Sequence, residues 1–387
     1  MPIRSALRVR AGGVPPGAVH PRRRWRESDR LHPPRGARGG GGMSVLLEAH
    51  DLTVSYRVGS ALWARVRGHA VPEVHAIEQV DLVVERGSVV GIVGESGCGK
   101  STLAKALVGL APLAGGSITL DGEALSPRRT PQQTRRVQMV FQDPSASLDP
   151  SMTIGQTLRE LLRVHRMVAP ADVQARAEEL LRRVELPVSL LQAYPRRLSG
   201  GQRQRVGIAR ALALEPEVLV ADESVAALDV SVQAAILNLL QRLRAELGLT
   251  ILFISHDLAV VRHLCDRVVV MYLGTVVEDR PTEELFEDPR HPYTAALLSS
   301  APRLGFEKLS GGSALSGEPG SLHSVPSGCR FHPRCPVARD ECADRVPALA
   351  GPTPDQRAAC HFAWDPDVLP PERTGSLTRG VDRMEPL

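Results

Sequence analysis

A glycine-rich segment, set between an apolar run and a helix-like run, indicates the fold class of this chain. Residues 88–93 read SVVGIV, which is typical of a short buried strand, and residues 103–110 read LAKALVGL, which is typical of a helix. The segment between them, residues 94–102, reads GESGCGKST and carries the spacing G-x-x-x-x-G-K-S. A chance glycine-rich turn would lack a strand before it and a helix after it. We therefore predict a phosphate-binding loop in an α/β fold.

The spacing of this loop follows from the chemistry of phosphate binding. Glycines let the backbone curl so that successive N–H groups point at phosphate oxygens, and the helix start adds a partial positive charge. Lys100 is placed to reach the β- and γ-phosphates, and the Ser101 hydroxyl is placed to ligate Mg²⁺. We interpret Cys98 as a small space-filling residue and not as a redox group. The residues expected to bind the nucleotide are Gly94, Glu95, Ser96, Gly97, Cys98, Gly99, Lys100, Ser101 and Thr102.

Two further apolar runs end in residues suited to phosphate chemistry. Residues 218–221 (VLVA) lead into Asp222 and Glu223, and residues 250–255 (TILFIS) lead into His256. The carboxyl ends of parallel strands bind ligands at one edge of a sheet. Asp222 is therefore suited to hold Mg²⁺, and Glu223 to act as general base toward the attacking water. A lone histidine is more often an ordinary loop residue, but the strand-end position of His256 favours a contact with the γ-phosphate.

A second candidate anion site lies between these motifs, in residues 198–205, which read LSGGQRQR. Ser199 and Gln202 have the spacing of a capping box, which predicts a helix from about Gln202 to Leu214. The start of such a helix aims free N–H groups and a positive dipole end at an anion. Because the chain already has one complete phosphate loop, a second anion site in the same subunit needs a separate explanation.

Together these motifs resemble the nucleotide-binding subunit of an ATP-binding-cassette (ABC) transporter, over residues 45 to about 275. The resemblance implies an α/β cassette ATPase core with a parallel-sheet phosphate-loop subdomain, an antiparallel β subdomain and a helical subdomain. It also implies that the signature of one subunit closes over the ATP of another. The partner is a second, homologous cassette or a second copy of this chain. The signature residues are Ser199, Gly200, Gly201 and Gln202.

Further positions can be matched to the family one by one. Tyr56, in the predicted strand LTVSY, resembles the aromatic that stacks on adenine. Gln142, after the predicted strand VQMVF, resembles the glutamine that contacts Mg²⁺ and senses the γ-phosphate, so the expected Mg²⁺ ligands are Ser101, Gln142 and Asp222. Residues 227–229 (ALD) match the loop that communicates across the dimer, with Asp229 as its acid. Here Ala226 replaces the usual serine and Ser224 the usual proline, and neither change removes a catalytic group.

The region between Gln142 and the signature is predicted to be helical, with the helical subdomain at about residues 143–215. Apolar residues recur at steps of three and four in two runs, residues 154–165 and 173–184, and prolines at 170 and 187 interrupt the pattern. In the family, this subdomain meets the coupling helices of the membrane subunits. A free-standing helical decoration is the alternative.

The sequence after the cassette narrows the resemblance further. Residues 291–294 (HPYT), 328–336 (GCRFHPRCP) and 141–150 (FQDPSASLDP) look like segments of the ATPase subunits of oligopeptide and dipeptide importers. That group also contains importers of nickel and other solutes, which remain the alternative substrates. The resemblance implies an ATPase at the cytoplasmic face of the cell membrane that energises peptide import. Its expected partners are two integral membrane permease subunits and an extracytoplasmic substrate-binding protein.

Four of the six cysteines lie in a short segment of the expected C-terminal extension, residues 291–387, which follows a cassette at residues 43–290. A cytosolic chain would not normally hold disulfides there, and the spacings are wider than those of zinc knuckles. Four thiolates also suit a 4Fe–4S cluster, which some members of the resembling subfamily carry. Zinc, free thiols, and a contribution from His332 or His361 remain alternatives. The cysteines are Cys329, Cys335, Cys342 and Cys360.

The charge of the chain is unevenly distributed. Residues 1–42 hold ten arginines and two acidic residues, whereas residues 43–387 hold 37 basic and 41 acidic residues. The mildly acidic body argues against a nucleic-acid partner. We expect residues 1–42 to be a disordered basic tail, interpreted as a mis-called start with Met43 as the true one; a lipid anchor is the alternative.

A remaining alternative is a cassette ATPase of the translation or DNA-repair type, which does not act in transport. Members of the translation type have two cassettes in one chain, and members of the repair type interrupt the cassette with long coiled coils. This chain has one phosphate loop, one signature and no sustained heptads. The motif count therefore favours the transporter subunit. No run approaches the roughly 18 apolar residues that a membrane-spanning helix requires.

Overall fold

The computed structural model describes residues 44–57, 73–143, 147–223, 229–300 and 320–365. The chain divides into two units, residues 1–42 and residues 43–387, and all described residues belong to the second. The basic tail therefore lies outside the described residues, as do Ala227 and Leu228 of the expected dimer-communication loop.

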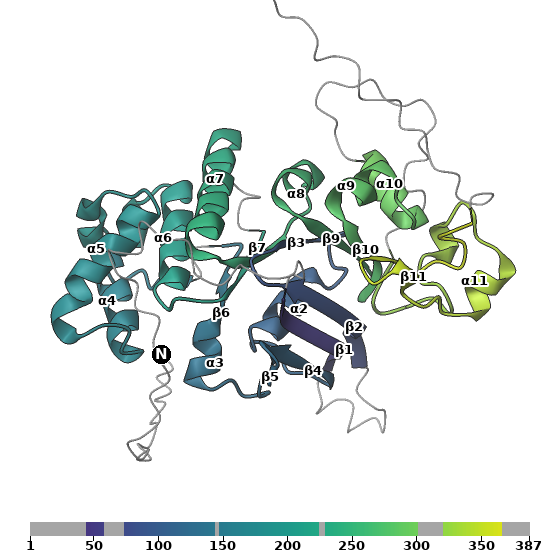
Figure 1. The fold of residues 1–387 in the computed structure, drawn as a ribbon, viewed down its shortest axis with the longest axis horizontal. Helices are drawn as coiled ribbons and strands as arrows, with labels where there is room; N and C mark the ends of the chain where they lie inside the picture. The colour runs from purple at the N-terminus through teal and green to yellow at the C-terminus, as the bar shows by residue number, and fades with distance from the viewer. Residues whose placement is uncertain (1–43, 58–72, 144–146, 224–228, 301–319, 366–387) are drawn as a thin grey trace, which may run out of the picture. The chain divides into compact units, whose positions relative to one another are not determined.

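An eight-stranded mixed sheet runs through this unit, in the order β11-β12-β10-β9-β3-β8-β7-β6 (Figure 1). The strands from β9 to β6 run parallel, and β10, β12 and β11 are antiparallel to their neighbours. The predicted strands of the phosphate-loop subdomain are confirmed. They are β3 Val89–Val93, β6 Val137–Val140, β7 Val218–Asp222 and β8 Thr250–Ile254. Four strands that were not predicted complete the sheet: β9 Arg267–Tyr272, β10 Thr275–Pro281, β11 Ala350–Thr353 and β12 Gln356–Ala358.

The parallel strands are buried on both faces, which explains why they read as continuous apolar runs. Successive side chains of a strand point to opposite faces. Val89 and Val93 of β3 therefore enter one core, and Val90 and Ile92 enter the other. The sheet thus separates two apolar cores that pack different elements.

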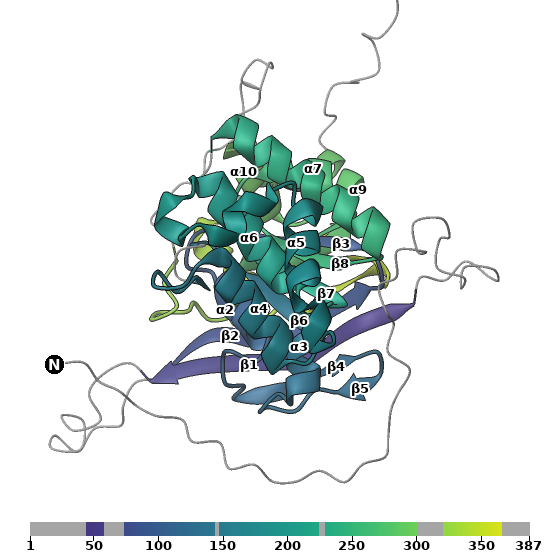
Figure 2. The ribbon, with the colours of Figure 1, turned by 90° about the vertical axis from the view of Figure 1, so that its left-hand side faces the viewer.

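A four-stranded antiparallel sheet covers one face, in the order β2-β1-β4-β5 (Figure 2). Its residues share a core with helix α2, which begins at Lys100 within the phosphate-loop motif. This sheet confirms the expected antiparallel β subdomain. The bounds are β1 Val45–Arg57, β2 Glu73–Glu85, β4 Gly115–Leu120, β5 Glu123–Ala124, α2 Lys100–Leu107 and α3 Pro131–Arg136.

Helices cover the other face of the eight-stranded sheet, and α4, α5 and α6 gather at its β6 end (Figure 1). The apolar periodicity of this region is confirmed, because Leu158 and Leu162 of α4 pack with Ala177 and Leu181 of α5. No helix among the described residues is long and apolar enough to cross a membrane. The bounds are α4 Ile154–Val164, α5 Val173–Arg183, α6 Gly200–Leu212, α7 Val230–Leu247 and α8 Leu258–Leu264.

The described C-terminal residues join the cassette directly. The β11–β12 hairpin pairs with β10 through Glu278 opposite Ala358 and Asp279 opposite Arg357, so it extends the central sheet. Phe331 is buried in the same core as the helices. The expected small extension is therefore continuous with the cassette sheet and core. The remaining helices are α9 Thr282–Glu287, α10 Pro292–Ser300 and α11 Asp340–Asp344.

Candidate active site

The phosphate loop connects β3 to α2, and its glycines are required by geometry. Gly94 and Gly99 have φ angles of 149° and 110°, in the region that disfavours side chains. A Cβ at Gly94 would lie 2.2 Å from the carbonyl oxygen of Met271, and one at Gly99 would lie 2.5 Å from that of Ala76. The loop is therefore pressed against neighbouring backbone and has no room for substitution at these two positions.

Lys100 is buried at the start of α2. Its Nζ donates hydrogen bonds of 2.8 Å to the carbonyl oxygens of both Gly94 and Glu95, so the ammonium lies within the curl of the loop. Cys98 is also buried, and its Sγ lies 3.8 Å from Nζ of Lys100. Burial raises the pKa of the Cys98 thiol, which favours its protonated form. This supports a space-filling role for Cys98.

Ser101 and Asp222 come together across the sheet. The Ser101 hydroxyl donates to Oδ1 of Asp222 over 3.1 Å, although 121 residues separate them. Asp222 is buried at the end of β7, and this burial raises the pKa of its carboxyl, opposed by the Ser101 hydrogen bond. Two of the three expected Mg²⁺ ligands thus meet beside the loop, and their oxygens are the donors that Mg²⁺ prefers.

Glu223 lies one residue further, at the centre of a polar cluster. Nε2 of Gln142 donates to its Oε2 over 2.7 Å, and Nδ1 of His256 lies 3.7 Å from its Oε1. These three residues follow the neighbouring strands β6, β7 and β8, so the predicted strand-end residues do converge. The cluster holds a carboxylate, an amide and an imidazole within reach of one another.

The backbone of Glu223 is unusual. Its φ is 42°, a conformation uncommon for a residue other than glycine, and its N–H donates to the carbonyl of Ile254 over 3.0 Å. Such conformations persist where surrounding structure imposes them, often at functional sites. No local sequence signal indicated this conformation.

The predicted capping box at the signature is confirmed, and it opens α6 slightly earlier than expected. Ser199 Oγ accepts from the N–H of Gln202 over 3.2 Å, and the Gln202 side chain accepts from the N–H of Ser199 over 3.0 Å. Gly201 faces α7, where an added Cβ would lie 2.4 Å from a methyl group of Val232. Among the described residues, no hydrogen bond or ion pair joins residues 199–202 to the phosphate loop of the same chain.

Two other predicted residues lie at exposed positions. Tyr56 is near the end of β1 with 42% of its surface exposed, and exposed Asp229 precedes α7 as its N-cap residue. An exposed ring is free to stack on a base. Both positions remain predictions.

The C-terminal segment reaches the phosphate loop, which sequence reasoning had missed. The N–H of Glu95 donates to the Tyr293 hydroxyl over 2.7 Å. The Glu95 carboxylate pairs with both terminal nitrogens of Arg334, each over 3.0 Å. These contacts join residues 198 and 239 positions apart, so no local pattern could have indicated them.

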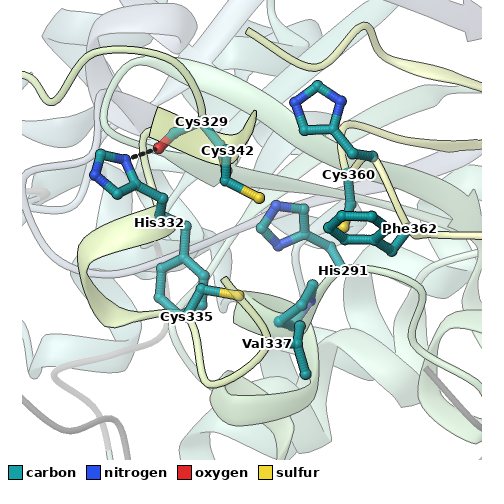
Figure 3. A pocket seen from close by; sticks show the side chains of 11 residues that line it. His291, Cys329, His332, Cys335, Val337, Cys342, Cys360 and Phe362 are labelled. Carbon is teal, nitrogen blue, oxygen red and sulfur yellow. Dashed lines mark hydrogen bonds between the residues drawn. The ribbon is translucent and has the colours of Figure 1, made fainter. Parts of the chain in front are cut away.

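The four clustered cysteines line one pocket, together with His291, Phe331 and Phe362 (Figure 3). All four thiols are free. Burial raises the pKa of Cys335 to about 11 and that of Cys360 to about 12, and the charges of the neighbouring cysteines add to both shifts. In the described part of the chain, no three or more His, Cys, Asp or Glu side chains are arranged to hold a single metal ion. The cysteines are therefore neighbours without forming a mononuclear site.

Two family models match this chain. Residues 77–226 match the model described as ABC transporter, and residues 277–342 match the model described as oligopeptide/dipeptide transporter, C-terminal region. The second match includes most of β10, the HPYT segment and three of the four clustered cysteines.

Curated relatives cover most of the chain. A probable peptide ABC transporter ATP-binding protein of Sinorhizobium fredii is 47% identical over 321 residues, covering 82% of this chain and 90% of the relative. A putative peptide import ATP-binding protein of Brucella ovis is 48% identical over 287 residues, covering 73% of this chain and 90% of the relative.

Solved structures match the cassette region. A dimeric ATP-binding cassette in a post-hydrolysis state, bound to ADP and Pi, has a TM-score of 0.53 and 28% identity, covering 61% of this chain and 99% of that chain. A protein from Clostridium perfringens, described as part of an ABC transporter complex, has a TM-score of 0.53 and 30% identity. The match covers 62% of this chain and 90% of that chain.

Proposed function

This chain belongs to the ABC transporter ATP-binding proteins of the oligopeptide/dipeptide subfamily, and from that premise we propose how its residues drive peptide import. It is the ATP-binding subunit of a peptide import transporter, and its activity is ATP hydrolysis. The observation that supports the assignment of residues most strongly is the meeting of Ser101 and Asp222 beside Lys100 and Glu223.

Binding of ATP begins at the phosphate loop. Backbone N–H groups at residues 94–102 and the start of α2 attract the phosphates, and Lys100 adds a full positive charge. Ser101, Asp222 and Gln142 supply oxygen donors for Mg²⁺, which when bound would neutralise phosphate charge. Tyr56 stacks on the adenine.

Hydrolysis requires a base beside the γ-phosphate, and Glu223 takes that role. A water oxygen attacks the γ-phosphorus as the bond from that phosphorus to the bridging oxygen breaks, and ADP leaves. The water proton passes to the Glu223 carboxylate. Gln142 and His256, both beside Glu223, orient the carboxylate and the water.

The signature acts on a second subunit. Ser199, Gly200, Gly201 and Gln202 open α6, whose N-terminus suits an anion, while the phosphates of this subunit are held by its own loop. A matching solved cassette is described as dimeric. We propose that two cassettes close over two ATP molecules, with Asp229 in the loop that communicates between them. The second cassette is a homologous subunit or another copy of this chain.

The remaining partners follow from transport. We propose that α4, α5 and α6 meet two integral membrane permease subunits at the cytoplasmic face of the cell membrane. An extracytoplasmic binding protein delivers the substrate. The relatives are described as peptide transport and peptide import proteins, which favours a peptide over nickel as the substrate.

We propose that the cysteine pocket holds a 4Fe–4S cluster. Four free thiols line one pocket, and four thiolates are the usual ligands of such a cluster. When bound, the cluster would supply a structural tie between the segments that carry the cysteines.

Reconstituted transport tests the proposed function. The chain is assembled with its permeases and second cassette in proteoliposomes, with binding protein and labelled peptides of two to five residues. We expect ATP-dependent peptide uptake, and Lys100→Ala in this chain to reduce ATP binding and uptake at least tenfold. Uptake of Ni²⁺ with no uptake of any peptide would reject the peptide assignment. ATP binding equal in the wild type and Lys100→Ala would reject the nucleotide site.

A further inference from the structure

Glu95, the second residue of the phosphate loop, is held from three sides. Its carbonyl accepts from Lys100, its N–H donates to the Tyr293 hydroxyl, and its carboxylate accepts from Arg334. Lys100 belongs to the loop, whereas Tyr293 and Arg334 come from the C-terminal segment. A single loop residue therefore links the nucleotide site to a distant part of the chain.

The two C-terminal partners are themselves rigidly packed. Tyr293 is fully buried, with its ring centroid 4.6 Å from that of Tyr272 and 5.4 Å from that of Phe331. The guanidinium of Arg334 lies 6.0 Å from the Tyr272 ring and 5.9 Å from the Phe331 ring, and only 8% of its side chain is exposed. Aromatic packing and a two-bond pairing fix both groups in one geometry. They can thus hold the loop in place.

Charge gives Arg334 a specific role. Glu95 places a carboxylate in the loop that receives the polyphosphate, and like charges at short range oppose each other. Its pairing with Arg334 cancels that charge, and solvent screens the pair only partly because little of the Arg334 side chain is exposed. Without Arg334, the negative charge of Glu95 would remain uncompensated in the loop that binds the phosphates.

We infer that Arg334 and Tyr293 are positioning residues that hold Glu95 and thereby set the affinity of the phosphate loop for ATP. This inference rests on the proposed function, because it assumes that the loop binds ATP. Neither residue touches the reacting atoms. The step of hydrolysis depends on Glu223, Gln142 and His256, which belong to a separate cluster.

Because Arg334 and Tyr293 lie outside the cluster around Glu223, their substitution should change KM for ATP much more than kcat. In the assembled transporter, Arg334→Gln should raise KM for ATP about tenfold and change kcat less than twofold, since ground-state binding weakens and the base stays in place. Arg334→Lys keeps the positive charge but loses the pair of hydrogen bonds to Glu95, so its KM should lie between those of the wild type and Arg334→Gln. Tyr293→Phe keeps the ring and loses the acceptor for the Glu95 N–H, so KM should rise severalfold.

A double-mutant cycle tests the charge argument. Glu95→Gln combined with Arg334→Gln removes both charges, so the double variant should bind ATP more tightly than Arg334→Gln alone. A merely structural role for Arg334 would leave the double variant as weak as the single one. Arg330→Gln is the matched control, because Arg330 lies in the same segment and pairs with Glu78 outside the loop.

The outcomes separate this inference from the proposed function. Isothermal titration of ATP with Mg²⁺ into the full chain should detect binding in the wild type and lose it in Lys100→Ala. If wild-type chain binds ATP and Arg334→Gln and Tyr293→Phe both stay within twofold of its affinity, the inference is overturned and the proposed function stands. A double variant no better than Arg334→Gln would also overturn it. Wild-type chain that binds no ATP would overturn both.

Melting curves check that each variant folds. Tyr293→Phe and Arg334→Lys retain the aromatic packing and the charge, so they carry the test if Arg334→Gln does not fold. An Arg330→Gln variant that raises KM as much as Arg334→Gln would also count against the inference.

Discussion

At the scale of single residues, the catalytic candidates could be predicted because each one ends an apolar run. Asp222, Glu223 and His256 follow strands that the sequence marks clearly. Their convergence at one edge of the sheet was expected. The hydrogen bond between Gln142 and Glu223 was not, since these residues are 81 positions apart and meet because β6 and β7 are neighbours. The positive φ of Glu223 likewise depends on its backbone bond to Ile254, beyond the reach of local sequence patterns.

Glu223→Gln tests the role of the proposed base. The change removes the proton acceptor but retains the size of the side chain and leaves Lys100, Ser101 and Asp222 to hold ATP with Mg²⁺. We expect ATP hydrolysis by the assembled transporter to fall at least a hundredfold, while ATP affinity changes little. Phosphate release gives the rate, and titration calorimetry gives the affinity.

The control for this change is Asp222→Asn, which should weaken ATP binding that depends on Mg²⁺. A homologous second cassette could hydrolyse ATP at its own site, so its base is removed in the same preparation. More than half of the normal rate in Glu223→Gln would show that another group acts as the base.

At the scale of elements, length and periodicity decided what could be predicted. The α4 and α5 helices have repeating apolar patterns, the strands β3, β6, β7 and β8 are short apolar runs, and each lies where the sequence indicated. The fifth parallel strand, β9, was not predicted. The β11 and β12 strands have four and three residues, and β11 reads AGPT with every residue exposed. Such a strand has no alternation of buried and exposed residues that a sequence pattern could reveal. It forms through its pairing with β12, which in turn pairs with β10.

The junction between β10 and α10 has two buried titratable groups whose pKa values shift in opposite directions. Glu278 accepts from the N–H groups of Arg290 and His291, over 2.8 and 2.9 Å. Burial raises the pKa of Glu278 from 4.5 to about 6. Burial lowers the pKa of His291 from 6.5 to about 3, although a hydrogen bond with Ala359 opposes that shift. The two groups therefore affect stability in opposite directions as pH changes.

Glu278→Gln should expose the contribution of His291. Between about pH 4.5 and 6, the folded state keeps a proton on Glu278 that the unfolded state loses, so this group lowers the unfolding free energy as pH rises. In the same window His291 is protonated in the unfolded state but not in the folded state. This group therefore raises the unfolding free energy as pH rises. With Gln at position 278, unfolding free energy should rise with pH more steeply than in the wild type, by roughly 1.4 kcal/mol per pH unit.

Urea unfolding of the full chain at several pH values across this window measures the two slopes. The added variant Glu278→Gln with His291→Gln should return a shallow slope, because both groups are then gone. Parallel pH profiles for the wild type and Glu278→Gln would contradict the assigned shift of Glu278.

At the scale of the whole described unit, one sheet organises two cores and a phosphate loop. The sequence indicated the cassette, its subdomains and the residues of the candidate nucleotide site, because these follow from motifs with local spacing. It did not indicate that the C-terminal segment extends the same sheet and holds the loop through Arg334 and Tyr293. Such contacts arise only from the tertiary fold. The described C-terminal residues are thus part of the structural support of the nucleotide site.

The proposed cluster is tested on the same scale, since it would join parts of the C-terminal segment to one another, in addition to the contacts that this segment makes with the cassette. Ligation by Cys329, Cys335, Cys342 and Cys360 would tie this segment in the way that metals stabilise small domains. We expect full chain purified anaerobically to be brown and to contain about four irons per chain.

Replacing any one of these cysteines with serine should lower the iron content and speed proteolysis of residues 329–362. ATP binding should weaken, because Arg334 lies in the loosened segment, but it should not be lost, because Lys100 and Ser101 are intact. Cys265→Ala is the matched control: its buried thiol lies outside the cysteine pocket, so this variant should keep its iron. A colourless preparation without iron would reject the cluster. One zinc per chain in that sample would identify the alternative metal, and no metal at all would leave four reduced thiols packed around the pocket.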